Sequence, residues 1–261
     1  MPTALLSSTY FGPVQWYQKL YRYDHCLIER HDSYVKQTYR NRCLIATTNG
    51  VQALTVPTKA PSNLPPKGEA FEAPSNLPSK GEAFEAPSNL PPKGEAFEVT
   101  SAATKASPFG GRLEGAGPYI SDHGNWRHQH WQALQSAYGD SPFFEYYEDD
   151  LRPFFTERWE LLYDFNEAIR VKMCELLDIR PHVSFTTEYI RPDTLAAPDA
   201  MQGDPALHDF RDSIQPKHPA PDPDFQPRPY YQVYRSKHGF LPNLSILDLL
   251  LNMGPESIFF L

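Results

Sequence analysis

The sequence has few cysteines, and none of them is spaced as a redox or metal-binding pair. Cys26, Cys43 and Cys174 are an odd number in a chain of 261 residues, and no two of them form a CxxC motif. This usage argues against a disulfide framework and favours a reducing compartment.

Long hydrophobic runs are also missing. No apolar stretch approaches the roughly 18 residues that a membrane-spanning helix needs. The N-terminal stretch MPTALLSSTYFGP lacks a basic region and has too short an apolar run for a signal peptide. We therefore expect a cytoplasmic protein without a membrane span.

Several common catalytic motifs are absent as well. The chain has no GxGxxG after a strand, no GxxxxGK[ST] and no GxSxG, which argues against a standard Rossmann dehydrogenase, P-loop kinase or serine hydrolase. Positive charge is in deficit, with 24 Lys and Arg against 32 Asp and Glu and a net charge of −8. This balance argues against nucleic acid as a partner.

A near-exact repeat interrupts the chain. Residues 60–98 contain three copies of the 13-residue unit APSNLPPKGEAFE, and Ser79 is the one departure. The unit is Pro-rich, shorter than solenoid repeats and too poor in apolar residues to build a core. We expect a disordered surface insert in a single domain made of 1–59 and 99–261, with a Pro-rich partner-binding segment as the alternative.

Hydrophobic patterns predict an α/β or α+β fold, with a mixed β-sheet and covering helices. A βαβ-like opening is expected, in which two short strands flank a helix that starts near Pro13. Asn49-Gly50 between two β-rich runs predicts a hairpin. Further elements are expected as follows: helices over 126–138, 153–177 and 245–252, a turn over 143–149, and strands over 4–8, 26–29, 40–47, 52–57, 183–189 and 230–234.

The segment before the hairpin is unusually basic. Lys36, Thr38, Arg40 and Arg42 occupy every second position of a strand-like run, so a strand would present three cations on one face. Such a face binds an anion, such as a carboxylate, a phosphate or a nucleotide-sugar pyrophosphate, because Arg offers a planar fork and Lys a point charge. The alternative is a solvated face that pairs with the excess of acidic residues.

The block NWRHQHW at 125–131 is dense in polar and aromatic side chains. Its histidines do not have the i, i+4 spacing of helical metal ligands, so we expect no metal site. His130 is a candidate general base because histidine titrates near neutral pH; the alternative is a histidine packed beside Trp131. Asn125 is expected to cap the helix.

The Pro- and Asp-rich segment 191–229 is long enough to act as a functional loop. It would supply Arg211 and Lys217 to an anionic substrate, with Asp209 as acid or base; the alternative is a solvated loop. Near the C-terminus, Ser245 and Asp248 have the spacing of a capping box, so Asp248 is interpreted as a capping carboxylate.

Several of these blocks together resemble the WbqC-like proteins of bacterial cell-envelope polysaccharide loci. The resemblance rests on motifs that cover most of 1–57 and 119–261 and skip the repeat: YFGP (10–13), VKQTYRNRC (35–43), the hairpin from Asn49 to Pro57, DHGNWRHQHWQAL (122–134), SPFFEYYEDD (141–150) and YYQVYRSKHGFLPNLSILDLL (230–250).

The resemblance implies a transferase of O-antigen synthesis that acts on a small anionic or nucleotide-activated substrate, with glycine transfer to a sugar as one form. It carries over no catalytic residues and names no cofactor. The alternative is a non-catalytic binding or scaffold protein that uses the same basic groove. Besides the residues above, Asn41, Trp126 and Gln232 complete the candidate substrate-binding side chains.

Overall fold

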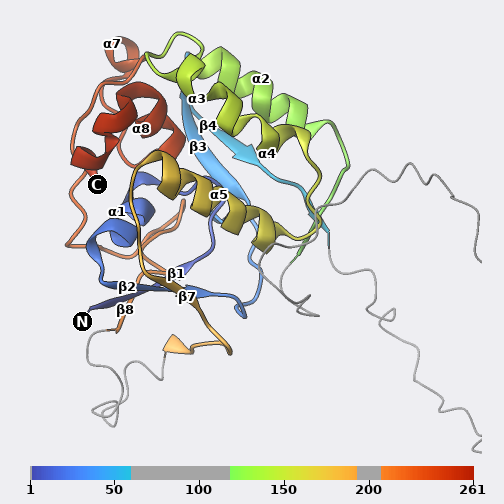
Figure 1. Cartoon of the computed structure of the whole chain (residues 1–261), viewed down its shortest axis with the longest axis vertical. Coiled ribbons are helices and arrows are strands. Elements are labelled where there is room, and N and C mark those ends of the chain that lie inside the picture. The colour runs from blue at the N-terminus through green and yellow to red at the C-terminus, as the bar shows by residue number, and fades with distance from the viewer. Residues whose placement is uncertain (1, 60–117, 193–206) are drawn as a thin grey trace, which may run out of the picture.

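The fold contains a four-stranded parallel sheet, which lies below the helices in the view of Figure 1. The structure is a computed structural model that describes residues 2–59, 118–192 and 207–261; the repeat at 60–98 lies outside these residues. The strands follow the order β7-β2-β1-β8. Their bounds are Thr3–Ser7 for β1, His25–Glu29 for β2, Val183–Phe185 for β7 and Leu207–Asp209 for β8.

The N-terminal part forms the βαβ unit that the hydrophobic pattern predicts. Strands β1 and β2 pair in parallel from Thr3 opposite His25 to Ser7 opposite Glu29. The connecting helix α1, Val14–Arg22, follows directly after Pro13, where the fixed φ of proline suits a helix start. Two parallel strands must be joined by a crossover connection, and α1 provides the crossover between β1 and β2.

Helix α5, Leu162–Leu176, lies on the same side of the sheet as α1 (Figure 1). The helix predicted over 153–177 is in fact interrupted. The short helix α4, Pro153–Thr156, ends before Leu161, which forms a bridge with Tyr119. The pairing of Leu161 with Tyr119 therefore interrupts a segment whose hydrophobic pattern predicts one continuous helix.

The predicted hairpin is present but separate from the parallel sheet. Strand β3, Arg42–Thr47, pairs antiparallel with β4, Gly50–Thr55. The turn residues are Thr48 and Asn49, one position earlier than predicted, and Gly50 has a φ of 102°, which only glycine adopts freely. A two-stranded pair of β5, Thr58–Lys59, and β6, Tyr119–Ile120, follows.

Helices pack an aromatic core against this hairpin. Helix α2 has the predicted bounds, Trp126–Tyr138. Asn125 precedes it, but its side chain makes no capping hydrogen bond. The predicted turn over 143–149 is wrong, because Phe144–Leu151 forms helix α3 and buries Phe144, Tyr147 and Leu151.

The C-terminal segment ties the hairpin to the start of α1. Helix α8, Ile246–Met253, begins after Ser245, whose Oγ accepts from the Leu247 amide and donates to the Phe11 carbonyl. The Ser245 amide donates to the Leu44 carbonyl at 2.8 Å. A 3-10 helix η2, Gly254–Phe260, ends the chain.

The strand predicted over 230–234 is wrong. These residues form no strand and lead into the short helix α7, Arg235–His238. Tyr230 and Gln232 instead turn inward to Asp248. In the described ranges, no helix is both long and apolar enough to cross a membrane.

Candidate functional site

The site contains a cavity of about 410 Å³ at the carboxyl ends of the parallel strands. Because parallel strands end at the same edge, the residues that follow β1, β2, β7 and β8 meet there. Ser7, Ser8 and Thr9 come from β1 and its end, and Tyr189 follows β7. Open α/β sheets bind ligands in this place, where neighbouring connections leave in different directions.

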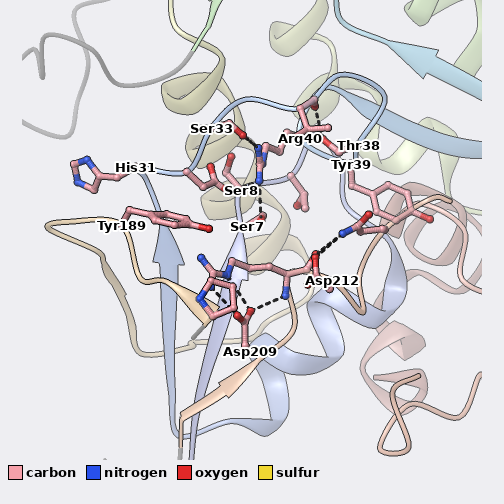
Figure 2. Close-up of a pocket in the computed structure, with 16 residues that line it drawn as sticks. Ser7, Ser8, His31, Ser33, Thr38, Tyr39, Arg40, Tyr189, Asp209 and Asp212 are labelled. Carbon is pink, nitrogen blue, oxygen red and sulfur yellow. Dashed lines mark hydrogen bonds and ion pairs between the residues drawn. The ribbon is translucent and has the colours of Figure 1, made fainter. Parts of the chain in front are cut away.

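One wall of the cavity comes from residues 31–40, which follow β2. The Arg40 guanidinium donates to the Ser33 carbonyl at 2.8 Å and forms an ion pair with Asp32. It also lies 3.4 Å from the Ser7 hydroxyl. Figure 2 shows Arg40 on this wall, on the opposite side of the cavity from Asp209.

The opposite wall comes from β8 and the residues after it. The Arg211 guanidinium donates Nε–H and Nη2–H to the two oxygens of Asp209, at 2.9 and 2.7 Å. The backbone amide of Arg211 also donates to Asp209, at 3.0 Å. This bidentate geometry fixes the guanidinium plane. Asp212 and Gln215 extend the wall, and their side chains are hydrogen-bonded to each other.

Behind the cavity, Glu29 joins three of the loops that form it. Its side chain is fully buried and accepts from the Thr186 hydroxyl, the His31 amide and the Ile190 amide. Arg211 Nη1 lies 3.3 Å from the second oxygen. A buried carboxylate is stable when it is paired and hydrogen-bonded in this way. Glu29 therefore holds the segments after β2, β7 and β8 together.

Asp32 has an altered proton affinity. Burial raises its pKa above the usual range, and the Glu29 charge acts in the same direction, while Arg40 opposes the shift. Among the described residues, Oδ2 of Asp32 pairs with Arg40. Asp32 is thus a carboxylate at the cavity wall that takes up a proton more readily than an exposed aspartate.

The cavity is not the cationic groove that the sequence predicts. Arg40 and Arg211 line it together with Asp32, Asp209 and Asp212, and each guanidinium already has a carboxylate partner. The arginines therefore act as oriented hydrogen-bond donors more than as free positive charges.

The predicted row of cations on one strand face is wrong, because residues 36–41 form turns and β3 begins only at Arg42. Lys36 is exposed and does not line the cavity. Arg42 Nε donates to the Thr55 hydroxyl at 3.2 Å across the hairpin. Lys217 is exposed and donates to Gln37 at 2.9 Å. Of the predicted cations, the structure brings Arg40 and Arg211 into the cavity.

Four other predicted residues lie away from the cavity, in the interior. Trp126 donates to the Ser121 carbonyl, and Asn41 donates to the Val56 carbonyl. The side-chain amide of Gln232 donates to Asp248 and to the Leu241 carbonyl, and it accepts from the Leu241 backbone amide. Each of these three is 5% exposed or less. Their contacts explain them as supports of the hairpin, of α2 and of the C-terminal segment.

His130 is the fourth interior residue. Its Nδ1 is hydrogen-bonded to the Tyr10 hydroxyl at 2.9 Å, and its ring packs against Trp126. Burial lowers the pKa of His130 to about 4, opposed by a backbone hydrogen bond with Thr55. The imidazole is therefore neutral near pH 7. It does not line the cavity that contains Arg40 and Asp209.

Asp248 is not the capping carboxylate that its spacing predicts. It is 0% exposed and accepts from Tyr138, Tyr230 and Gln232, at 2.9, 2.6 and 2.8 Å. Burial raises its pKa, and the three donors oppose the rise. Asp248 thus belongs to an interior cluster that joins α2, α8 and the segment before α7.

Reasoning from the sequence missed Asp32, Glu29 and Tyr189. All three follow or end strands of the parallel sheet, so their positions at strand ends are the signal that could have found them. No group of three or more His, Cys, Asp or Glu side chains in the described ranges is arranged to hold a metal ion.

This geometry defines a class of protein: an α/β protein with a ligand-sized cavity at the ends of its parallel strands. The sequence profile of the WbqC-like protein family matches residues 8–66 and 118–201, more than half of the chain. The chain therefore belongs to the WbqC-like family. The matched ranges include Asp32 and Arg40 and stop before Asp209 and Arg211. Neither the curated proteins nor the solved structures include a match.

Proposed function

We propose that this protein is a transferase of cell-envelope polysaccharide synthesis. It binds a small anionic or nucleotide-activated sugar substrate in the strand-end cavity and transfers an amino-acid group such as glycine to a sugar. The observation that supports a site of chemistry is the meeting of Arg40, Asp209 and Arg211 in one cavity of about 410 Å³. The link to envelope polysaccharides comes from the resemblance described under the sequence analysis, and the family match supports membership alone.

The paired arginines suit the recognition of a polar substrate. Arg211 is held by the two oxygens of Asp209, and Arg40 is held by Asp32 together with the Ser33 carbonyl. Their remaining N–H groups are therefore directed before the substrate arrives. Asp212 and the Ser7 and Ser8 hydroxyls offer further hydrogen-bond groups for substrate hydroxyls.

Asp32 is the proton acceptor in this proposal. Asp209 was the acid or base expected from the sequence, but both of its oxygens already accept from Arg211. Asp32 has the raised pKa that favours proton uptake. In the transfer, an acceptor O–H or N–H gives its proton to Asp32 while its lone pair bonds the transferred group. The bond to the donor's leaving group breaks, and that group leaves with the electron pair.

A panel of nucleotide sugars, amino acids and aminoacyl donors tests this proposal by product detection in a mass spectrometer. Asp32→Asn should lower turnover by about 10²-fold or more, since this is the typical contribution of a general base, and should leave substrate binding within about threefold. The matched control is Asp140→Asn, because Asp140 is exposed after α2.

The non-catalytic alternative makes a different prediction. A binding or scaffold protein would show saturable binding of a panel member, seen as a rise in thermal stability, with no product from any donor and acceptor pair. That result would contradict the transferase proposal and leave the cavity as a binding site.

A further inference from the structure

A third guanidinium lies beside the cavity, and it differs from the other two in lacking a carboxylate partner among the described residues. Arg30 follows β2 directly, and its guanidinium lies 4.4 Å from the ring centre of Tyr163 and 4.9 Å from that of Phe185. Aromatic faces stabilise a cation without using its N–H groups. Arg30 is therefore held in place with its hydrogen-bond donors still available.

Two buried donors at this place have no partner among the described residues. The atoms are Arg30 Nε and the Tyr163 hydroxyl, and Tyr163 is 8% exposed. A buried polar group without a partner costs about 1–3 kcal/mol, so such groups usually meet a water, an ion or a ligand.

A second, smaller cavity of about 30 Å³ joins these donors to the main one. Arg30 and Tyr163 line it, and it shares Ser8, Asp32 and Arg40 with the larger cavity. Its volume exceeds the roughly 10–15 Å³ that a cavity needs to hold one water molecule. It can therefore take one oxygen atom of a larger group whose remainder lies in the main cavity.

We propose that Arg30 and Tyr163 form the anion subsite of the cavity and receive one oxygen of a phosphate or carboxylate group of the substrate. The inference rests on the proposed function, because it places the anionic end of that substrate. Arg40 and Arg211 are already neutralised by Asp32 and Asp209, whereas no described carboxylate pairs with Arg30. An anion therefore gains most from Arg30.

Binding of two simple anions to the full chain tests the subsite. Isothermal titration with inorganic pyrophosphate represents phosphoryl ligands, and titration with acetate represents carboxylates. Arg30→Met keeps a long apolar side chain against the two rings and removes the charge. We expect it to weaken the binding of the preferred anion about tenfold or more, the typical loss for a hydrogen bond to a charged group.

Tyr163→Phe provides an independent variant that does not depend on the folding of Arg30→Met. It removes a hydroxyl without a hydrogen-bond partner in the described part of the chain, so no hydrogen bond within that part is lost. It should also weaken anion binding about tenfold. The matched control is Arg180→Met, which makes the same charge change at an exposed position before β7 and should bind within about twofold of the wild type.

The outcomes separate this inference from the proposed function. Arg30-dependent binding of pyrophosphate supports a phosphoryl ligand, and Arg30-dependent binding of acetate supports a carboxylate. If Arg30→Met and Tyr163→Phe bind as the wild type does, while Arg40→Lys and Arg211→Lys bind more weakly, the subsite is wrong and the proposed function stands. If the wild type binds neither these anions nor any nucleotide sugar, both are wrong.

Discussion

The cavity at the strand ends and the interior cluster around Asp248 both gather carboxylates and hydrogen-bond donors, yet they are built differently. In the interior cluster, Tyr138, Tyr230 and Gln232 all direct donors at one carboxylate that is 0% exposed. At the strand ends, Arg40 and Asp32 remain about 15% exposed and border a cavity of about 410 Å³. Polar groups lie in both places, but only in the second do they face space for a ligand.

This difference separates residues that support the fold from residues that can meet a substrate. A buried carboxylate surrounded by fixed donors has no capacity left for another molecule, and removing it leaves those donors unpaired. A paired guanidinium beside a cavity keeps some of its five N–H groups for a ligand. Changes in the interior should therefore affect the free energy of unfolding, and changes at the cavity should affect ligand binding.

The largest effect is expected for the interior cluster. Asp248→Ala leaves Tyr138, Tyr230 and Gln232 without their shared acceptor and should lower the free energy of unfolding by roughly 3–5 kcal/mol. Urea denaturation measures this as a lower midpoint at an unchanged slope. Asp248→Asn keeps one acceptor oxygen and should lose less. A loss below about 1 kcal/mol for Asp248→Ala would mean that the cluster does not stabilise the fold.

His130 should make stability depend on pH. Its pKa is about 4 in the folded protein and 6.5 in the unfolded chain, so the unfolded chain binds more protons between these values. The stabilisation is complete above pH 6.5 and falls by roughly 3 kcal/mol as the pH drops to about 4.

The comparison with His130→Gln isolates this contribution, because Asp32 and Asp248, whose raised pKa values act in the opposite direction, are present in both proteins. Urea denaturation at several pH values should give a shallower dependence for His130→Gln. Equal slopes in the two proteins would contradict the assignment of His130 as a neutral, buried support.

At the cavity, Arg40→Lys keeps the charge and removes the planar fork. It should weaken the binding of an active nucleotide sugar about tenfold, equivalent to about 1.4 kcal/mol. Arg42→Lys is the matched control two positions away, since Arg42 bonds Thr55 across the hairpin and does not line the cavity. Titration calorimetry compares the two variants; equal losses would place the ligand outside the cavity.

The smallest effects are expected for the exposed lysines. Lys36→Ala and Lys217→Ala remove cations that do not line the cavity. Each should change the free energy of unfolding by less than about 0.5 kcal/mol, as is usual for surface sites, and should leave nucleotide-sugar affinity within about twofold. Affinity that fell tenfold in either variant would restore the anion site that the basic run predicts.

Local signals in the sequence were sufficient for much of the fold. Pro13 marked the start of α1, Asn49-Gly50 located the hairpin within one residue, and α2 has its predicted bounds. The interrupted helix before α5 was not foreseen, because the bridge between Tyr119 and Leu161 is a contact across the chain. The hydrophobic pattern of a short segment carries no information about its contacts with distant parts of the chain.

The site was predictable only in part, for the same reason. Asp209 and Arg211 could be selected by residue type and by their place in a long loop, and Arg40 as a member of the basic run. Their meeting depends on β8, a three-residue strand in a Pro-rich segment that pairs with β1. Asp32 and Glu29 form no sequence motif, because their roles depend on contacts between segments that follow different strands.

The ligand is expected to bind where the parallel strands end. Hydrogen–deuterium exchange of the full chain, with and without a nucleotide sugar that raises its thermal stability, locates the binding site. Protection should increase together in residues 7–9, 31–40 and 209–215, with little change in 126–138. Protection confined to 126–138 or to the hairpin turn, with none at the strand ends, would contradict this expectation.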